Sequence, residues 1–142
     1  MQSEMSDRDT SEATDPGWRL LLCDDSTTER TTLAQLLRRE GYDVDEAADG
    51  AAALLLLKGR GGYDLLLLDL QMPGIDGFDV LAHVQIHRPD LAVVLLSGLP
   101  PETIGGGLDR LPRHELPPLL LKPIDTRQLF QVIELKLAGE LP

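Results

Sequence analysis

Polar side chains directly follow apolar runs at four places in this 142-residue chain. The set comprises Asp24, Asp25, Asp69, Ser97 and Lys122. In an open sheet of parallel strands, ligands bind at the carboxyl ends of the strands. If each apolar run is a strand of one such sheet, these side chains meet at a single edge.

Three carboxylates at one edge favour a metal ion. Like charges about 4 Å apart cost several kcal/mol at intermediate dielectric, and a hard divalent cation removes that cost. Mg²⁺ prefers oxygen ligands and keeps several waters. We therefore expect Asp25 and Asp69 to bind Mg²⁺ directly, together with the backbone carbonyl of Gln71. Asp24 is expected to bind it directly or through water.

A lysine and a hydroxyl beside such a metal indicate phosphoryl chemistry. Lys122 supplies a compact cation and Ser97 a hydrogen-bond donor. Together with Mg²⁺ they would neutralise the oxygens of a phosphoryl group on Asp69. Phosphoryl transfer depends mostly on positioning and charge neutralisation, and an aspartyl phosphate is a known type of covalent intermediate.

The elements that position these residues follow from the alternation of apolar runs with helical patterns. The predicted strands are 19–23, 42–46, 64–69, 91–96 and 119–121, and the predicted helices are 26–40, 50–58, 77–87 and one that begins at 125. Continuous apolar strands between helices indicate an α/β fold with a doubly wound parallel sheet, covered by helices on both faces. Ser26 to Glu29 has the pattern of a capping box, and Asp125 is the cap expected for the last helix. Gly77 is expected to allow a close backbone approach.

The chain is predicted to hold one domain, 18–142, behind a disordered, acidic N-terminal tail, 1–17. The least regular stretch is 100–118, which contains five prolines and three consecutive glycines. Each glycine costs a helix about 1 kcal/mol. We expect a short or frayed helix there.

Composition excludes several classes of function. The net charge is −11, which disfavours direct nucleic-acid binding. Cys23 is the sole cysteine, so neither an internal disulfide nor a cysteine-based zinc cage can form. The apolar runs are far shorter than the roughly 20 residues of a membrane span, and the N-terminus does not resemble a signal peptide. We expect a cytoplasmic protein.

Four motifs occur in order along the chain, and together they resemble a known family. They are LLLCDDS (Leu20–Ser26), LLLLDLQMPGIDGFDVL (Leu65–Leu81), LLSG (Leu95–Gly98) and LLLKPID (Leu119–Asp125). This combination resembles the receiver domain of two-component response regulators and covers all of the chain except the tail. The resemblance implies a flavodoxin-like sheet with strand order 2-1-3-4-5 and a signalling role rather than an enzymatic one.

The resemblance also implies a role for each site residue. Asp69 would be the phosphoacceptor, loaded by a histidine kinase or a histidine phosphotransfer protein. Asp24 and Asp25 would be the Mg²⁺-binding acid pair. Ser97 would be the switch hydroxyl, which moves toward the phosphoryl group, and Lys122 would contact the phosphate. The signal would pass to an effector domain or a downstream protein.

Two features depart from the family pattern, and the resemblance also predicts the isomer of one peptide bond. Leu119 stands where the family usually has the aromatic second switch residue, so an aromatic-rotamer switch is excluded. The segment between Ser97 and Lys122 is a few residues longer than is common, so the face that the family usually uses for output and dimerisation is atypical here. The Lys122–Pro123 peptide is expected to be cis, an isomer found in only about 5–6% of X–Pro bonds.

Two alternative functions stay open at this point. Leu119 and the altered segment before Lys122 are compatible with a pseudo-receiver that docks partners without being phosphorylated. An aspartyl-phosphate hydrolase would use Asp69 as nucleophile, but such enzymes usually have a second aspartate two residues later. Gln71 occupies that position and argues against hydrolysis.

Overall fold

The computed structural model describes residues 17–59, 62–72, 74, 76–100, 109, 111–112 and 116–139. Within these residues, an α-helix follows every strand except the fourth one along the chain. They are β2 (Arg19–Cys23), α1 (Thr27–Arg39), β3 (Asp43–Ala47), α2 (Gly50–Gly59), β4 (Leu65–Asp69), α3 (Gly77–His87), β5 (Ala92–Ser97), β6 (Leu119–Leu121) and α4 (Thr126–Leu137). The predicted strands and the helices predicted at 26–40, 50–58, 77–87 and from 125 are present, and each bound differs by at most one residue.

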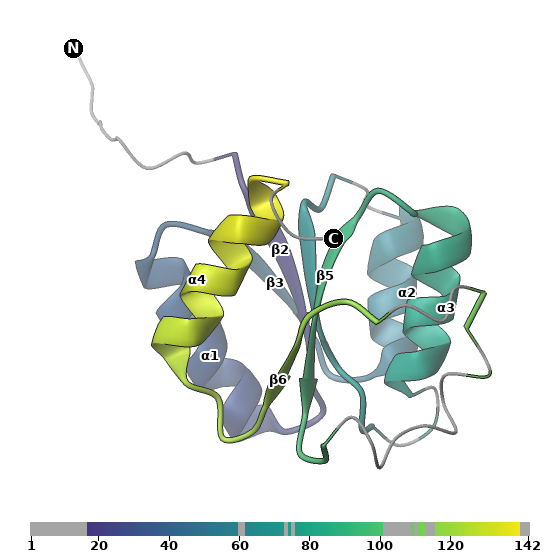
Figure 1. Cartoon of the computed structure of the whole chain (residues 1–142), viewed down its shortest axis with the longest axis horizontal. Helices are drawn as coiled ribbons and strands as arrows, with labels where there is room; N and C mark the ends of the chain where they lie inside the picture. The colour runs from purple at the N-terminus through teal and green to yellow at the C-terminus, as the bar shows by residue number, and fades with distance from the viewer. Residues whose placement is uncertain are drawn as a thin grey trace.

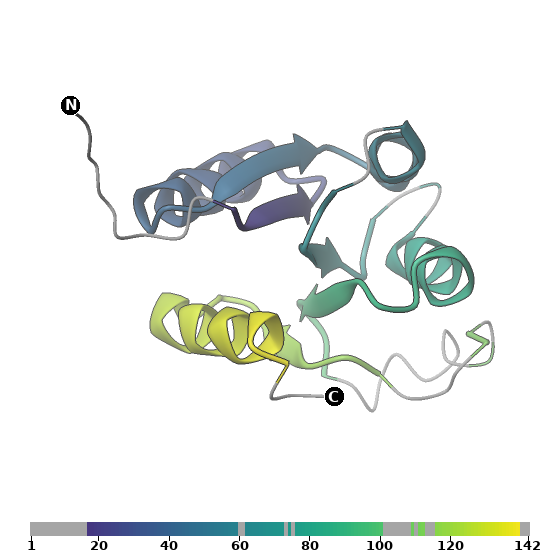
Figure 2. The same cartoon turned by 90° about the horizontal axis from the view of Figure 1, so that it is seen from above.

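The strands form one parallel sheet in the order β3-β2-β4-β5-β6, which is the predicted 2-1-3-4-5 order. Helices α1 and α4 lie side by side on one face, and α2 and α3 lie on the other (Figures 1 and 2). The predicted doubly wound α/β fold is therefore confirmed. The polar strand β3 occupies one edge and the short strand β6 the other, whereas the largely apolar strands β2, β4 and β5 lie inside.

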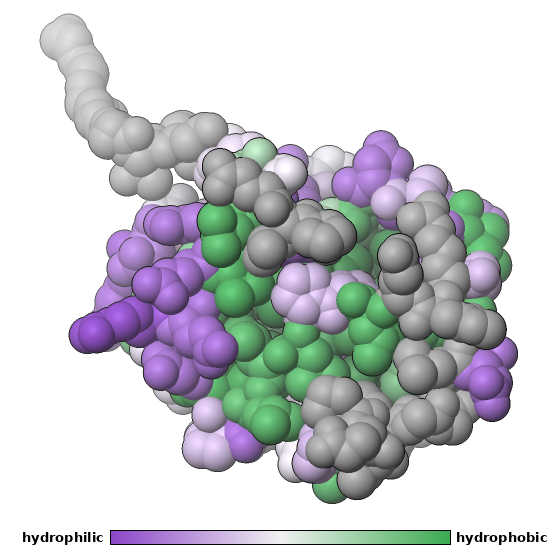
Figure 3. Space-filling view, in the orientation of Figure 1, coloured by the Kyte–Doolittle hydropathy of each residue, from purple (hydrophilic) through white to green (hydrophobic). Residues whose placement is uncertain are grey.

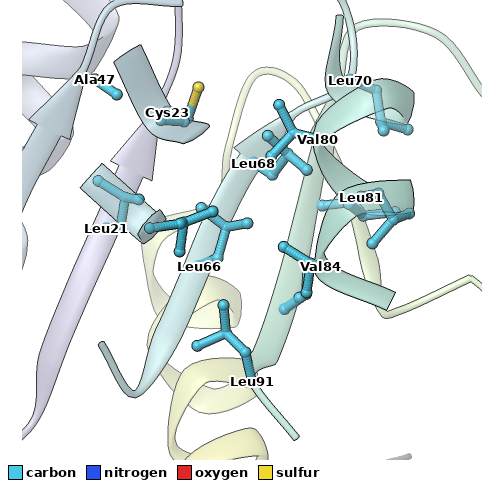
Figure 4. Close-up of a cluster of buried hydrophobic side chains, with 14 of the residues drawn as sticks. Leu21, Cys23, Ala47, Leu66, Leu68, Leu70, Val80, Leu81, Val84 and Leu91 are labelled. Atoms are coloured by element: carbon cyan, nitrogen blue, oxygen red, sulfur yellow. The ribbon is translucent and has the colours of Figure 1, made fainter. Parts of the chain in front are cut away.

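Each face of the sheet buries its own hydrophobic cluster because successive side chains of a strand point in opposite directions. Leu21, Leu66 and Leu68 pack toward α2 and α3, in the cluster drawn in Figure 4. Leu20 and Leu67 pack toward α1 and α4. With helices on both sides, an inner strand must be apolar at every position, as β4 is up to Asp69.

Capping side chains fix where the helices begin. Asp125 caps α4 by accepting hydrogen bonds from the backbone N–H groups of Arg127 and Gln128, at 3.0 and 3.2 Å. Ser26 caps α1 by accepting from the Glu29 N–H at 3.3 Å. A reciprocal capping box that sequence inspection missed opens α3, between Asp76 and Asp79.

Two sequence predictions lie outside the described residues. One is the disordered tail, of which only residue 17 is described, and the other is the short helix expected within 100–118, where residues 101–108 are not described. In the part of the chain that the structure covers, no helix has the length and apolar character needed to cross a membrane.

Candidate functional site

The carboxyl edge of the sheet gathers the acids that the sequence singled out. Asp24 and Asp25 directly follow β2, and Asp69 is the last residue of the neighbouring strand β4. Carboxylate oxygens of the three residues lie within 4.8 Å of one another. Asp24 and Asp69 are buried, while Asp25 faces solvent. The predicted acidic cluster is thus present, with one open side.

Lys122 reaches into this cluster from the end of β6. Its Nζ donates to Asp69 Oδ2 at 3.0 Å and to Asp24 Oδ2 at 3.3 Å. A further acceptor is Glu29 Oε1, at 2.9 Å. Sequence inspection assigned Glu29 to a capping box only. Its place in the first turn of the helix after the acid pair was the signal that could have revealed it.

Backbone groups fix the two buried carboxylates from the other side. Asp69 Oδ1 accepts from the Gln71 N–H at 2.9 Å, and Asp24 Oδ1 accepts from the Ser26 N–H at 2.9 Å. Arg30 Nη1 donates to the backbone oxygen of Asp24 at 2.9 Å. Each buried acid therefore has one oxygen held by the backbone and the other oxygen facing Lys122.

The environment shifts the proton affinity of Asp69. Burial raises the pKa of its carboxyl above the usual value, and the charge of Asp24 adds to this rise. The hydrogen bonds from the Gln71 N–H and from Lys122, together with the positive charge of Lys122, oppose it. Burial is the largest of these causes, and the net result is a raised pKa.

The acids in turn shift the pKa of Lys122. Burial lowers that pKa, but hydrogen bonds to Glu29 and Asp69 and the charges of Asp69 and Asp24 outweigh burial, so the pKa is raised. The side chain is therefore an ammonium at neutral pH. It supplies a fixed positive charge beside Asp69.

Ser97 lies next to the cluster, but its hydroxyl is turned to its own loop. The side chain is fully buried, and Oγ accepts from the Leu99 N–H at 3.0 Å while donating to the Leu99 carbonyl at 2.7 Å. Its backbone carbonyl accepts from the Lys122 N–H at 2.8 Å. The structure thus links Ser97 to Lys122 through the backbone and leaves the hydroxyl bonded to Leu99.

Neighbouring segments hold the site from outside. Gln71 Oε1 accepts from the Gly98 N–H at 2.8 Å, which ties the loop after β4 to the loop after β5. Leu119, at the atypical switch position, is half-buried and packs against the α2–α3 cluster. The peptide bond before Pro123 is cis, the isomer that the resemblance implies.

An apolar cleft of about 300 Å³ opens beside the acids, between α1 and the turn that leads from β6 into α4. Leu33, Leu36 and Ile124 line it, with Asp24, Glu29 and Lys122 among its polar residues. The ion pair between Glu29 and Lys122 therefore lies in an opening that solvent reaches.

The donor set of the cluster fits a hard divalent cation. It offers only carboxylate oxygens, which Mg²⁺ prefers, and the exposed Asp25 leaves room for the waters that Mg²⁺ retains. The repulsion among the acids is only partly balanced by Lys122. A divalent cation would complete the balance.

These features define the class of protein. The family model described as "Response regulator receiver domain" matches residues 20–134, and the chain therefore belongs to this family. Receiver domains are signalling modules of two-component systems that generally have no enzymatic activity of their own. The predicted family is confirmed.

Curated relatives are longer than this chain. Transcriptional regulatory protein TcrA of Mycobacterium tuberculosis is 34% identical over 119 residues, which cover 80% of this chain and 44% of that protein. The 3',5'-cyclic-nucleotide phosphodiesterase regA of Dictyostelium discoideum is 37% identical over 119 residues, covering 76% of this chain and 15% of that protein. The chain thus spans less than half the length of either relative.

Solved structures share the fold almost from end to end. The signal receiver domain of an HD domain-containing protein from Pseudomonas fluorescens Pf-5 superimposes with a TM-score of 0.77 at 28% identity, covering 87% of this chain and 96% of that one. The response regulator TrrA from Thermotoga maritima, solved in complex with Mg²⁺-BeF, gives a TM-score of 0.72 at 27% identity. The match covers 84% of this chain and 98% of that one.

Proposed function

We propose that this receiver domain accepts a phosphoryl group on Asp69 from a phosphohistidine of a histidine kinase or a histidine phosphotransfer protein. One observation carries the proposal. The buried carboxylate of Asp69 lies among two other acids, with Lys122 Nζ 3.0 Å from its Oδ2. A nucleophile, a cation and a set of metal ligands are thus assembled at one point.

In the proposed step, a carboxylate oxygen of Asp69 attacks the phosphorus atom. An O–P bond forms, the P–N bond of the phosphohistidine breaks, and its electron pair returns to the imidazole nitrogen. Lys122 Nζ lies 3.0 Å from Asp69 Oδ2 and so keeps a positive charge beside the point of attack. The backbone N–H of Gln71 holds the carboxylate in place.

Charge neutralisation is the main contribution of the surrounding residues. Asp24, Asp25, Asp69 and the backbone carbonyl of Gln71 would hold Mg²⁺, which supplies positive charge to the phosphoryl oxygens. Lys122, which directly follows β6, supplies further positive charge. Ser97 would exchange its hydrogen bond with the Leu99 carbonyl for one to a phosphoryl oxygen.

The partners of the domain are proposed from its family and its relatives. Receiver domains work with histidine kinases and with effector domains, and the relatives include a transcriptional regulator and the sensor protein EvgS of Escherichia coli O157:H7. We infer that this domain receives its signal from such a donor and passes it to an effector. Without an aromatic side chain at Leu119, the output would depend on Ser97 and the loop that follows it.

The test is phosphorylation by a small donor. Incubation with acetyl phosphate and Mg²⁺ should add about 80 Da to the intact protein, the mass of one phosphoryl group. Asp69→Asn should abolish the gain because the amide is not a nucleophile. Asp125→Asn is the matched control, since asparagine and aspartate cap a helix equally well, and it should label like the wild type.

Full labelling of the Asp69→Asn variant would refute the assignment of the phosphoacceptor. A wild-type protein that neither gains mass nor binds Mg²⁺ at millimolar concentration would favour the docking role of a pseudo-receiver. Repeated turnover of phosphate esters would instead indicate a hydrolase.

A further inference from the structure

Glu29 is a fourth acid at the site, and the proposed phosphoryl transfer does not need it. Its Oε1 lies 2.9 Å from Lys122 Nζ, the shortest of the three contacts that this ammonium makes with carboxylates. The side chain of Glu29 is 58% exposed, whereas those of Asp24 and Asp69 are 2% and 3% exposed. Lys122 is thus shared between two buried acids and one surface acid.

The backbone holds Glu29 where this contact forms. It lies in the first turn of α1, and its N–H donates to the capping hydroxyl of Ser26. In a capping box the glutamate would turn back to the cap. Here its carboxylate reaches across the cleft to Lys122, 93 residues later in the chain. The contact joins α1 to the turn that precedes α4, its neighbour on the same face (Figure 2).

Phosphorylation of Asp69 would require Lys122 to give up one of these three contacts. A lysine ammonium has three N–H donors, and Glu29, Asp69 and Asp24 provide an acceptor for each. A phosphoryl group adds new oxygen acceptors, so Lys122 must release one that it holds. Of the two carboxylates that remain once Asp69 carries the phosphoryl group, Glu29 is the cheaper to release, because water can solvate its exposed oxygens, whereas the buried Asp24 would lose its partner.

On the basis of the proposed function, we propose that Glu29 is a positioning residue that restrains Lys122 and slows phosphoryl loading of Asp69. The carboxylate competes with the incoming phosphoryl oxygens for the ammonium of Lys122, which it contacts at 2.9 Å.

The first experiment removes the charge of Glu29 and keeps its shape. Initial phosphorylation rates are measured with radiolabelled acetyl phosphate, at Mg²⁺ concentrations raised until each variant is saturated. Glu29→Gln should load about threefold to tenfold faster than the wild type, the size expected for one nearby charge that is partly screened by water. Glu40→Gln makes the same change in net charge at the far end of α1 and should leave the rate unchanged.

The second experiment asks whether Glu29 acts through Lys122. In a Lys122→Ala background, loading is slow because the cation is lost, and adding Glu29→Gln should change the rate by less than about twofold. An acceleration that persists in this background would show plain charge repulsion and overturn the positioning role. Equal rates for Glu29→Gln and the wild type would overturn the inference while leaving the proposed function intact. A wild-type protein that takes up no phosphoryl group would overturn both.

Discussion

The ammonium of Lys122 lets the acids of the site coexist. Asp24 and Asp69 have almost no solvent contact, and buried carboxylates are costly unless positive charge or hydrogen bonds compensate them. Lys122 provides both to each of them. Removal of Lys122 would leave two buried negative charges facing each other. We therefore interpret this residue as part of the folded structure as well as of the chemistry.

His83 provides a pH-dependent contribution to stability, far from the acids. Its ring lies 4.4 Å from that of His87, one turn further along α3, measured between centroids. Partial burial lowers the pKa of His83 below its usual 6.5, and the charges of His87 and Lys58 lower it further. The unfolded chain therefore takes up a proton at a higher pH than the folded chain does. Stability falls as the pH drops from about 6.5 toward the lowered pKa.

The His83→Gln variant should lose less stability than the wild type between pH 7.5 and pH 5.5, two values that lie about one pH unit on either side of the unfolded pKa. Urea unfolding at both pH values measures the difference. His87→Gln is the control. Because it keeps His83, it should retain part of the loss of stability between pH 7.5 and pH 5.5, about one pH unit on either side of the unfolded pKa. Equal losses in the His83→Gln variant and the wild type would contradict the prediction.

At the scale of the elements, the junction of β4 and α3 positions Asp69. Gly77 begins α3 directly beneath the end of β4, and its N–H donates to the Leu70 carbonyl at 3.3 Å. A Cβ at this position would overlap the backbone oxygen of Asp69 and would lie 2.5 Å from the Cα of Leu70. The close approach expected from the sequence is confirmed, and glycine is required there for steric reasons.

Gly77→Ala should therefore destabilise the domain by about 2–3 kcal/mol, as overpacking against backbone does. It should also slow the labelling of Asp69, because the strand end that carries this residue must shift. Gly59→Ala is the matched control: no atom lies within 4 Å of its added Cβ, and alanine stabilises a helix by up to about 1 kcal/mol. Chemical denaturation compares the two variants. Similar denaturation midpoints for Gly77→Ala and Gly59→Ala would show that a Cβ at position 77 causes no steric clash with the end of β4.

At the scale of the whole molecule, charge and apolar surface are unevenly distributed. The chain carries a net charge of −11, and its folded state concentrates several acids at one edge of the sheet. On the face seen in Figure 3, apolar side chains gather near the centre, and hydrophilic ones gather on the side of α1 and α4. Two leucines near this edge of the sheet are exposed: Leu121, the last residue of the edge strand β6, and Leu99, two residues after the end of β5.

The acidic edge should make the stability of the molecule depend on divalent cations. A ligand that binds only the folded state stabilises it, by about 1.4 kcal/mol at ten times its dissociation constant. Millimolar Mg²⁺ should therefore raise the thermal midpoint by a few degrees, whereas NaCl of the same ionic strength should raise it less. In Asp25→Asn the difference between the two salts should shrink. Equal shifts with both salts in the wild-type protein would point to screening instead of binding.

The sequence by itself determined the elements and the composition of the site. Strands buried on both faces must be apolar throughout, and Asp125 caps a helix wherever the fold places it. These are local rules of burial and backbone hydrogen bonding, and they predicted the strand order once the family resemblance was added. Asp24, Asp25, Asp69 and Lys122 were identifiable because parallel strands bring their carboxyl ends to one edge.

Only the tertiary structure decided how the side chains at that edge pair with one another. Ser97 keeps its hydroxyl on Leu99, Gln71 bonds to Gly98 across two loops, and Glu29 leaves its capping box for Lys122. The chemical type of each of these polar groups allows it to bond with more than one kind of partner. Which partner wins depends on distances set by the packing of whole elements, and no local pattern in the sequence contains those distances.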